Sequence, residues 1–243
     1  MSAPLPFPFP LEAGVIRQRR ADILAQLCRM DAGFAAVPVK QILHSTLPAM
    51  LRLYDDAFLG GFLARAFGSI DVTLSSRLTS SAGKFICDRR ASVRMQHAEI
   101  RMSSDFLARL EKGPFSLNGL TAESPQEAFL IVFEHELCHA LETALYGSTG
   151  HSKRFLSLAH GLFGHTATRH SLPTRRQEAA ETGLSVGRRA RFAYQGRQLT
   201  GVITYVGKTA TVMVPDSRGA YRDRQGHRYA KFRVPLPLLM PCE

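Results

Sequence analysis

The stretch FEHELCHALETALYGSTGH, residues 133–151, places three histidines and several acids within an apolar helical pattern. Burying so many ionisable groups is unfavourable unless something pairs with them. His135, Glu136 and His139 form the pattern H-E-x-x-H. Side chains four residues apart on a helix lie about 6 Å apart along its axis, so both imidazoles can reach one metal ion. Glu136 lies about 100° around the helix from His135, where it can contact a water on that ion.

A third metal ligand has to come from outside this helix. Glu142 shares the stripe of the two histidines, but it lies about 10.5 Å along the axis from His135, too far for one ion with ligands about 2.1 Å away. Gly147 and Gly150 allow the chain to turn, and His151 is the first histidine after that turn. His151 is therefore the favoured third ligand.

We predict that His135, His139 and His151 bind one Zn²⁺ per chain, with Glu136 as the catalytic residue. Three protein ligands leave the fourth position for water, which is typical of a catalytic rather than a structural zinc site. The alternatives for the third position are later histidines, one of which can instead hydrogen-bond to a ligand: His160, His165 and His170.

The elements around these residues can be predicted from capping signals and periodicity. Ser124, Pro125 and Glu127 form a capping box that begins the metal-binding helix, which ends at Gly147. A second helix follows over 152–164. Apolar periodicity predicts three further helices: 15–30, with its arginines on the face opposite the apolar one, 39–57, followed by a break at Gly60-Gly61, and a short one at 104–112.

Other segments have the pattern of strands and loops. Residues 70–78 and 83–103 are β-branched and partly alternating, which favours strands, the second turning near 88–91. Residues 114–121 are expected to form a loop, and 165–183 an extended and then linker-like segment. After Gly183 the sequence changes to short alternating runs separated by turn residues, which indicates a small all-β unit.

FEHELCHALE followed by GHSKRFLSLAHGLFGHTATRHSL resembles the SprT-like (Spartan-type) zinc metalloproteases, whose pattern is H-E-x-x-H and then a histidine in an H-G-x-x-F-type segment. LYDDAFLGGFLARAFGSIDVTLSSRLTSSAGKF resembles the upstream part of the same family, so the resemblance covers about residues 40–172. It implies a zincin-like fold, zinc ligands at His135, His139 and His151, and a catalytic glutamate at Glu136. Ser152 stands where glycine is usual, and the cysteine zinc ribbon of many members is missing.

The fold class predicted for the chain is α+β, with zincin-like helices and a small mixed sheet followed by a small all-β barrel. The segment VGRRARFAYQGRQLTGVITYVGKTATVMV resembles SH3-like or KOW-type barrels. The domains expected from these patterns are a flexible proline-rich arm at 1–12, the SprT-like domain at 13–172, a linker at 173–185 and a basic SH3-like barrel at 186–241.

Charge is distributed unevenly along the 243 residues. Residues 1–150 hold 15 Lys and Arg against 15 Asp and Glu, whereas residues 151–243 hold 16 against 5. Such an asymmetry favours contact with a polyanion such as nucleic acid, and tyrosines lie among the basic residues, as suits base stacking. The resemblance to SprT-like proteases, which act on proteins crosslinked to DNA, implies DNA rather than RNA as the partner. The nucleic-acid-binding residues predicted from this pattern are Arg188, Arg189, Arg191, Arg197, Arg222, Arg224 and Arg228.

Composition narrows the class of protein further. Hydrophobic residues make up 45% of the chain, enough for a buried core, and no window has the roughly 20 apolar residues of a membrane span. Four scattered cysteines and an N-terminus without a basic, apolar leader favour a cytoplasmic protein.

The function expected from these observations is zinc-dependent endopeptidase activity on proteins bound or crosslinked to DNA, the activity that the family resemblance implies. One alternative is a non-catalytic adaptor, stabilised by zinc, that binds nucleic acid or protein. Another is a general peptidase whose barrel binds proteins. A separate alternative for the barrel alone is that it simply packs on the protease domain. The sequence leaves the oligomeric state open.

Overall fold

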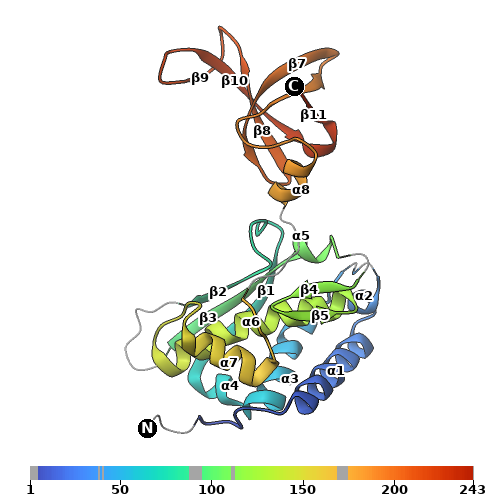
Figure 1. Cartoon of the computed structure of the whole chain (residues 1–243), viewed down its shortest axis with the longest axis vertical. Helices are drawn as coiled ribbons and strands as arrows, with labels where there is room; N and C mark the ends of the chain where they lie inside the picture. Colours follow the sequence, from blue (N-terminus) through green and yellow to red (C-terminus); the bar gives the residue numbers. More distant parts are fainter. Residues whose placement is uncertain are drawn as a thin grey trace. The chain divides into compact units, whose positions relative to one another are not determined.

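The structure is a computed structural model that describes residues 5–37, 39, 41–87, 95–110, 113–168 and 175–242 (Figure 1). The chain divides into two compact units, Met1–Leu172 and Pro173–Glu243, each with its own hydrophobic core. The turn predicted near 88–91 and the candidate ligand His170 lie outside the described residues. Within the described residues, no helix combines the length and apolar character needed to cross a membrane.

The N-terminal unit combines helices with a small mixed sheet, as predicted for an α+β fold. Its helices are α1 (Ala13–Met30), α2 (Ala32–Ala35), α3 (Thr46–Leu59), α4 (Phe62–Ala66), α5 (Ser104–Leu107), α6 (Pro125–Tyr146) and α7 (Lys153–Phe163). Its main sheet contains β1 (Phe67–Ser75), β2 (Gly83–Cys87) and β3 (Met95–Ser103) in the order β1-β3-β2. Because β3 pairs in parallel with β1 and antiparallel with β2, β2 is an edge strand of this sheet.

Helix α6 is the central element of the N-terminal unit. It contacts β2 and β3 of the sheet and also α1, α4 and α7 (Figure 1). Most of its residues are buried, which is expected for a helix that is apolar around most of its circumference. The sheet and the surrounding helices thus fix the orientation of the helix that carries the H-E-x-x-H pattern.

Helix α1 differs from the sequence prediction in the placement of one arginine. Arg20 lies on the buried stripe with Ile16, Ile23 and Leu27, although the arginines were expected on the opposite face. Its guanidinium donates from Nε and Nη2 to the two carboxylate oxygens of Glu134 on α6, at 2.7 and 2.8 Å. A buried arginine is tolerated at this position because a carboxylate pairs with it in bidentate geometry.

The proline-rich segment expected to be a flexible arm over residues 1–12 is packed against the core over its described part. Phe7 is buried, and Leu5, Phe9 and Leu11 contact the same core. The backbone N–H of Leu11 donates to the carbonyl of Gly161 on α7 at 2.8 Å. A Cβ on Gly161 would lie 2.4 Å from the ring of Phe9, so this glycine makes the close approach possible. Aromatic burial therefore overrides the tendency of a proline-rich sequence to remain extended in solvent.

The loop predicted at 114–121 is instead a β-hairpin, formed by β4 (Phe115–Leu117) and β5 (Leu120–Ala122). Its turn residues Asn118 and Gly119 both have positive φ, at 52° and 79°. Asn-Gly is the preferred sequence for a two-residue hairpin turn of this kind. The carbonyl of Asn118 accepts from the backbone N–H groups of Thr166 and Ala167, so the hairpin holds the segment that follows α7.

The C-terminal unit is an antiparallel six-stranded sheet, ordered β11-β6-β7-β8-β10-β9, with one short helix before it. Its elements are α8 (Arg175–Glu181), β6 (Arg189–Tyr194), β7 (Arg197–Val206), β8 (Thr209–Pro215), β9 (Tyr221–Arg222), β10 (Arg228–Pro235), the 3-10 helix η1 (Leu236–Leu238) and β11 (Met240–Pro241). The all-β character of this part agrees with the predicted fold class.

The segment expected as a linker at 173–185 contains helix α8. Residues 175–181, RRQEAAE, are good helix formers, and Ala179 of this helix is buried in the core of the C-terminal unit. Leu184 is buried in the same core. Because most of this segment is polar, its composition did not indicate that Ala179 and Leu184 pack in the core of the C-terminal unit.

Candidate metal centre

The helix that carries the first two histidines begins and ends at the residues that its sequence predicts. Ser124 is the N-cap of α6, and its Oγ accepts from the N–H of Glu127 at 3.1 Å. The Glu127 carboxylate accepts in return from the N–H of Glu123 at 2.8 Å. Gly147 ends the helix with φ of 69°, a left-handed conformation that favours glycine. The following loop can therefore turn back along the helix.

The three histidines proposed as ligands meet in space. The ring centroids of His135, His139 and His151 form a triangle with sides of 5.0 Å each. One nitrogen from each ring lies within 4.8 Å of the others, and Nε2 of His135 is 3.0 Å from Nε2 of His151. Two ligand nitrogens of a tetrahedral zinc are about 3.4 Å apart, so the three rings fit a zinc ion.

The rings are supported by residues that the sequence did not reveal. Phe155 of α7 is fully buried, and its ring lies 4.9, 4.5 and 5.0 Å from the rings of His135, His139 and His151. Nδ1 of His139 is 2.7 Å from the hydroxyl of Thr149. That contact occupies Nδ1 and leaves Nε2 to face an ion, as expected when a neighbouring group fixes the tautomer of a histidine ligand.

The loop that carries His151 is held by Glu142, the acid that spacing excluded as a ligand. Glu142 is buried, and its carboxylate accepts from the N–H of Gly150 at 2.8 Å and from the hydroxyl of Ser152. The same hydroxyl of Ser152 caps α7 by accepting from the N–H groups of Arg154 and Phe155. Ser152, expected to relax this loop slightly, therefore links it to both helices.

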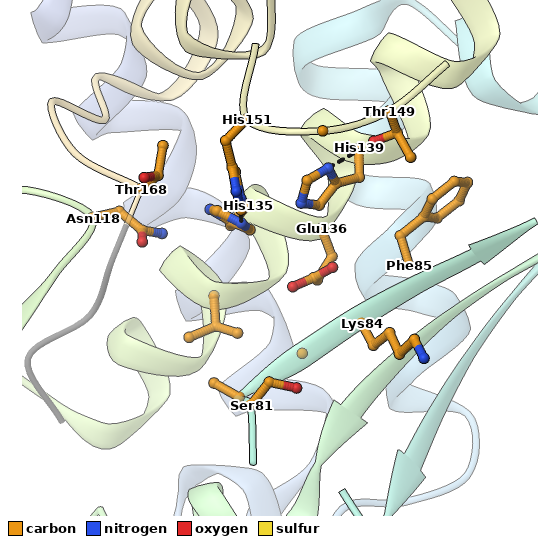
Figure 2. A pocket seen from close by; sticks show the side chains of 14 residues that line it. Ser81, Lys84, Phe85, Asn118, His135, Glu136, His139, Thr149, His151 and Thr168 are labelled. Carbon is orange, nitrogen blue, oxygen red and sulfur yellow. Dashed lines mark hydrogen bonds between the residues drawn. The ribbon is translucent and has the colours of Figure 1, made fainter. Parts of the chain in front are cut away.

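Glu136 lies beside the histidines with its carboxylate directed into the pocket (Figure 2). Its side chain is buried, and burial raises the pKa of the Glu136 carboxyl to about 8, although the backbone N–H of Phe85 opposes the shift. A nearby cation would favour the carboxylate form. A Cβ on Gly83 would lie 2.7 Å from Cγ and Oε1 of Glu136, so only a glycine lets β2 approach this closely.

Burial also affects His139, one of the three histidines of the site. It lowers the pKa of His139 to about 4, and the nearby His151 acts in the same direction. A neutral imidazole is the form that binds a metal. The protein therefore presents this ligand without first having to remove a proton near neutral pH.

The site opens into a pocket of about 390 Å³. One wall is formed by β2 and the residues before it, including Gly83 and Phe85, and the histidines and Glu136 form another. Asn118 of the β4–β5 hairpin and Thr168 also line the pocket (Figure 2). An edge strand thus forms one wall of the pocket and lies close to the glutamate.

The two later candidate ligands that the structure describes, His160 and His165, lie outside the triangle. His160 is exposed on α7, and His165 is buried with its Nε2 3.0 Å from Oε2 of Glu134. Glu134 also accepts from Arg20 and from the hydroxyl of Tyr54 at 2.9 Å. His165 therefore belongs to a buried polar network next to the metal-binding helix. Among the described residues, the group able to hold a metal consists of His135, His139 and His151.

The seven arginines proposed for nucleic-acid binding do not gather at one place. Four lie on or next to β6 and at the start of β7, and three lie on β9, in the following turn and at the start of β10. Six are exposed, whereas Arg228 is half-buried and donates from Nε to the carbonyl of Gly219 at 2.8 Å. The basic composition predicted that these side chains are exposed. The strand order places the group at β6 and β7 and the group at β9 and β10 in different parts of the sheet.

The α+β fold and the histidine triangle fit a protein able to hold a metal ion, and comparison with known families agrees. Residues 47–176 match the family described as SprT-like, so the chain belongs to the SprT-like family. This family is associated with zinc and with metallopeptidase activity. A search of curated proteins gives no match.

Proposed function

We propose that the protein is a zinc-dependent metalloendopeptidase that acts on proteins bound or crosslinked to DNA. The observation that carries the proposal is the common pocket of three converging imidazoles, a buried glutamate and an edge strand. His135, His139 and His151 would hold the zinc ion. Zinc bound there would polarise the scissile carbonyl and lower the pKa of a coordinated water.

The residues of the chain have distinct parts in such a reaction. Glu136 accepts the proton of the attacking water and passes it to the leaving amine, as a general base and then a general acid. An extended peptide can pair with the edge of β2, which runs along the same pocket and would orient the substrate. Burial of Glu136 strengthens the electrostatic interaction of its carboxylate with the substrate.

The C-terminal unit would bring this activity to DNA. We assign it to the SH3-like barrels, because its last strand, β11, returns to pair with its first strand, β6. Residues 184–243 hold 11 Lys and Arg against 3 Asp and Glu, which favours a polyanion. The cytoplasm is the expected compartment, because the four cysteines are scattered along the sequence without paired spacing.

Replacement of one carboxylate oxygen of Glu136 by an NH₂ group tests the peptidase proposal. Glu136→Gln should retain zinc but slow cleavage of a protein crosslinked to an oligonucleotide by about 10²–10⁴-fold, the usual contribution of a general base. Glu123→Gln, which changes an exposed acid, is the matched control and should cleave like the wild type. Equal cleavage by wild type and Glu136→Gln would instead support the alternative of a non-catalytic, zinc-stabilised adaptor.

A further inference from the structure

The C-terminal sheet has an open pocket of about 400 Å³ on the face opposite its core. Residues that pair directly across an antiparallel sheet project to the same face. Lys231 pairs with Met213, and Thr211 pairs with both Arg233 and Tyr205, so these side chains share one face. The other face carries the buried side chains of the core, among them Ile203, Val212 and Val234.

Two tyrosines in this pocket are unusually accessible for large aromatic residues. Tyr205 is 55% exposed and Tyr221 is 46% exposed. A Cβ on Gly207 would lie 2.9 Å from the ring and the hydroxyl of Tyr205, so the glycine leaves room for the ring to lie against the turn. The ammonium of Lys231 lies 5.5 Å from the centroid of the Tyr221 ring, within range of a cation–π contact. Both rings are thus held in place while remaining open to solvent.

The charge of the pocket is positive. Lys231 and Arg233 line it, and none of the described residues that line it is an Asp or Glu. Arg189 lies on the same outward side, because it pairs with Val202, which pairs with Met213, which pairs with Lys231. A row of cross-strand neighbours therefore extends the positive charge from the pocket toward β6.

We propose that this pocket binds single-stranded nucleic acid, with bases stacked on Tyr205 and Tyr221 and phosphates beside Lys231 and Arg233. Exposed aromatic rings next to cations are the combination that binds unpaired bases and their backbone together. In a duplex the faces of the bases are already stacked on one another. The phosphates of a duplex could therefore contact the cations, but its bases could not stack on the tyrosines. The inference rests on the proposed function for the kind of partner, a nucleic acid. It adds that the nucleic acid is single-stranded and that it binds in this pocket.

Binding of labelled oligonucleotides to the full chain tests the inference. The probes are a fluorescein-labelled 12-nucleotide oligo-dT and a hairpin duplex of similar charge, measured by fluorescence anisotropy at several salt concentrations. Tyr205→Ala and Tyr221→Ala should each weaken oligo-dT binding by about tenfold or more, since stacking on one aromatic ring contributes that much. Tyr205→Phe and Tyr221→Phe should bind like the wild type, because the ring that stacks is retained.

Tyr194→Ala is the matched control, because Tyr194 is 47% exposed on β6 and does not line the pocket. It should bind oligo-dT like the wild type. Replacing both Lys231 and Arg233 by Gln should lower the number of counterions released on binding, which is obtained from the salt dependence of the affinity, by about two. Circular dichroism melts of each variant separate a binding defect from unfolding.

Two results would overturn the inference. If the alanine variants of Tyr205 and Tyr221 bind oligo-dT like the wild type, or if Tyr194→Ala loses as much affinity, the pocket is not the site. If the duplex binds more tightly than oligo-dT and the tyrosine variants do not change its affinity, the proposal of a single-stranded ligand is rejected. The proposal that the partner is DNA would then remain. Because the assay needs no cleavage, its failure is distinct from failure of the peptidase proposal.

Discussion

At the residue scale, the candidate metal centre consists of candidate ligands that local spacing indicates and of supporting residues that it does not. His135 and His139 could be paired from the sequence because one helical turn brings them together. Thr149 lies ten residues from His139, and its contact depends on how the loop after Gly147 folds back. Such a contact has no sequence period, so no pattern could have identified it.

Removal of the Thr149 hydroxyl should weaken the metal site without unfolding the protein. Thr149→Val keeps the shape of the side chain but removes the partner of His139 Nδ1. Zinc affinity, measured by competition with a chelating dye, should fall by about 10–100-fold. Thr121→Val, an exposed threonine on β5, should leave the affinity unchanged. Equal affinities of all three proteins would mean that the hydroxyl does not orient the ring.

At the element scale, the loop between α6 and α7 is fixed by a carboxylate that belongs to the preceding helix. Glu142 bonds to Gly150 and Ser152, the residues on either side of His151. It thereby converts a glycine-rich turn into a defined support for the third histidine. Helical spacing excluded Glu142 as a ligand on distance grounds, but spacing alone could not assign it this other task.

A Glu142→Gln variant tests the support of the loop. The amide can accept one of the two hydrogen bonds, but its NH₂ group cannot accept from Ser152. We expect zinc affinity to fall by about tenfold, in the range usual for groups that orient a ligand, and the zinc-free protein to melt at a lower temperature. Glu123→Gln, exposed and outside the loop, is the control. An unchanged affinity together with an unchanged melting temperature would contradict the assignment.

Other elements show where local patterns are sufficient and where they fail. The capping residues of α6 and the break at Gly60-Gly61 follow from local chemistry, and both glycines have positive φ. The β4–β5 hairpin was missed although its Asn118-Gly119 turn carries a recognisable signal. Arg20 could not be placed from local sequence, because its partner Glu134 is 114 residues away.

The buried Arg20–Glu134 pair should contribute strongly to stability. Burial lowers the pKa of Arg20 by itself, but the Glu134 carboxylate outweighs it and raises the pKa above the usual value. Arg20→Met would leave that carboxylate buried with fewer donors, and we expect about 3 kcal/mol less unfolding free energy in urea titrations. Arg17→Met, exposed on the same helix, should cost less than about 0.5 kcal/mol. Similar losses of unfolding free energy in both variants would show that the Arg20–Glu134 pair does not account for the loss.

At the scale of the whole molecule, the chain joins a nearly neutral unit that carries the candidate metal site to a strongly basic β unit. The change of pattern after Gly183 predicted the β unit, whose first strand begins at Arg189. The cations that share a pocket with tyrosines, Lys231 and Arg233, could not be chosen from composition. Cross-strand register decides which side chains share a face, and a basic sequence with many arginines does not reveal that register.

The proposed activity depends on one divalent ion, bound by two imidazoles of α6 and a third from the loop between α6 and α7. Elemental analysis of the purified full chain would detect that ion, with His151→Ala compared against His160→Ala, which alters an exposed histidine on α7. We predict about one zinc per chain in the wild type and in His160→Ala, and loss of most of the zinc in His151→Ala. Full zinc in His151→Ala, or equal loss in both variants, would be incompatible with this metal site.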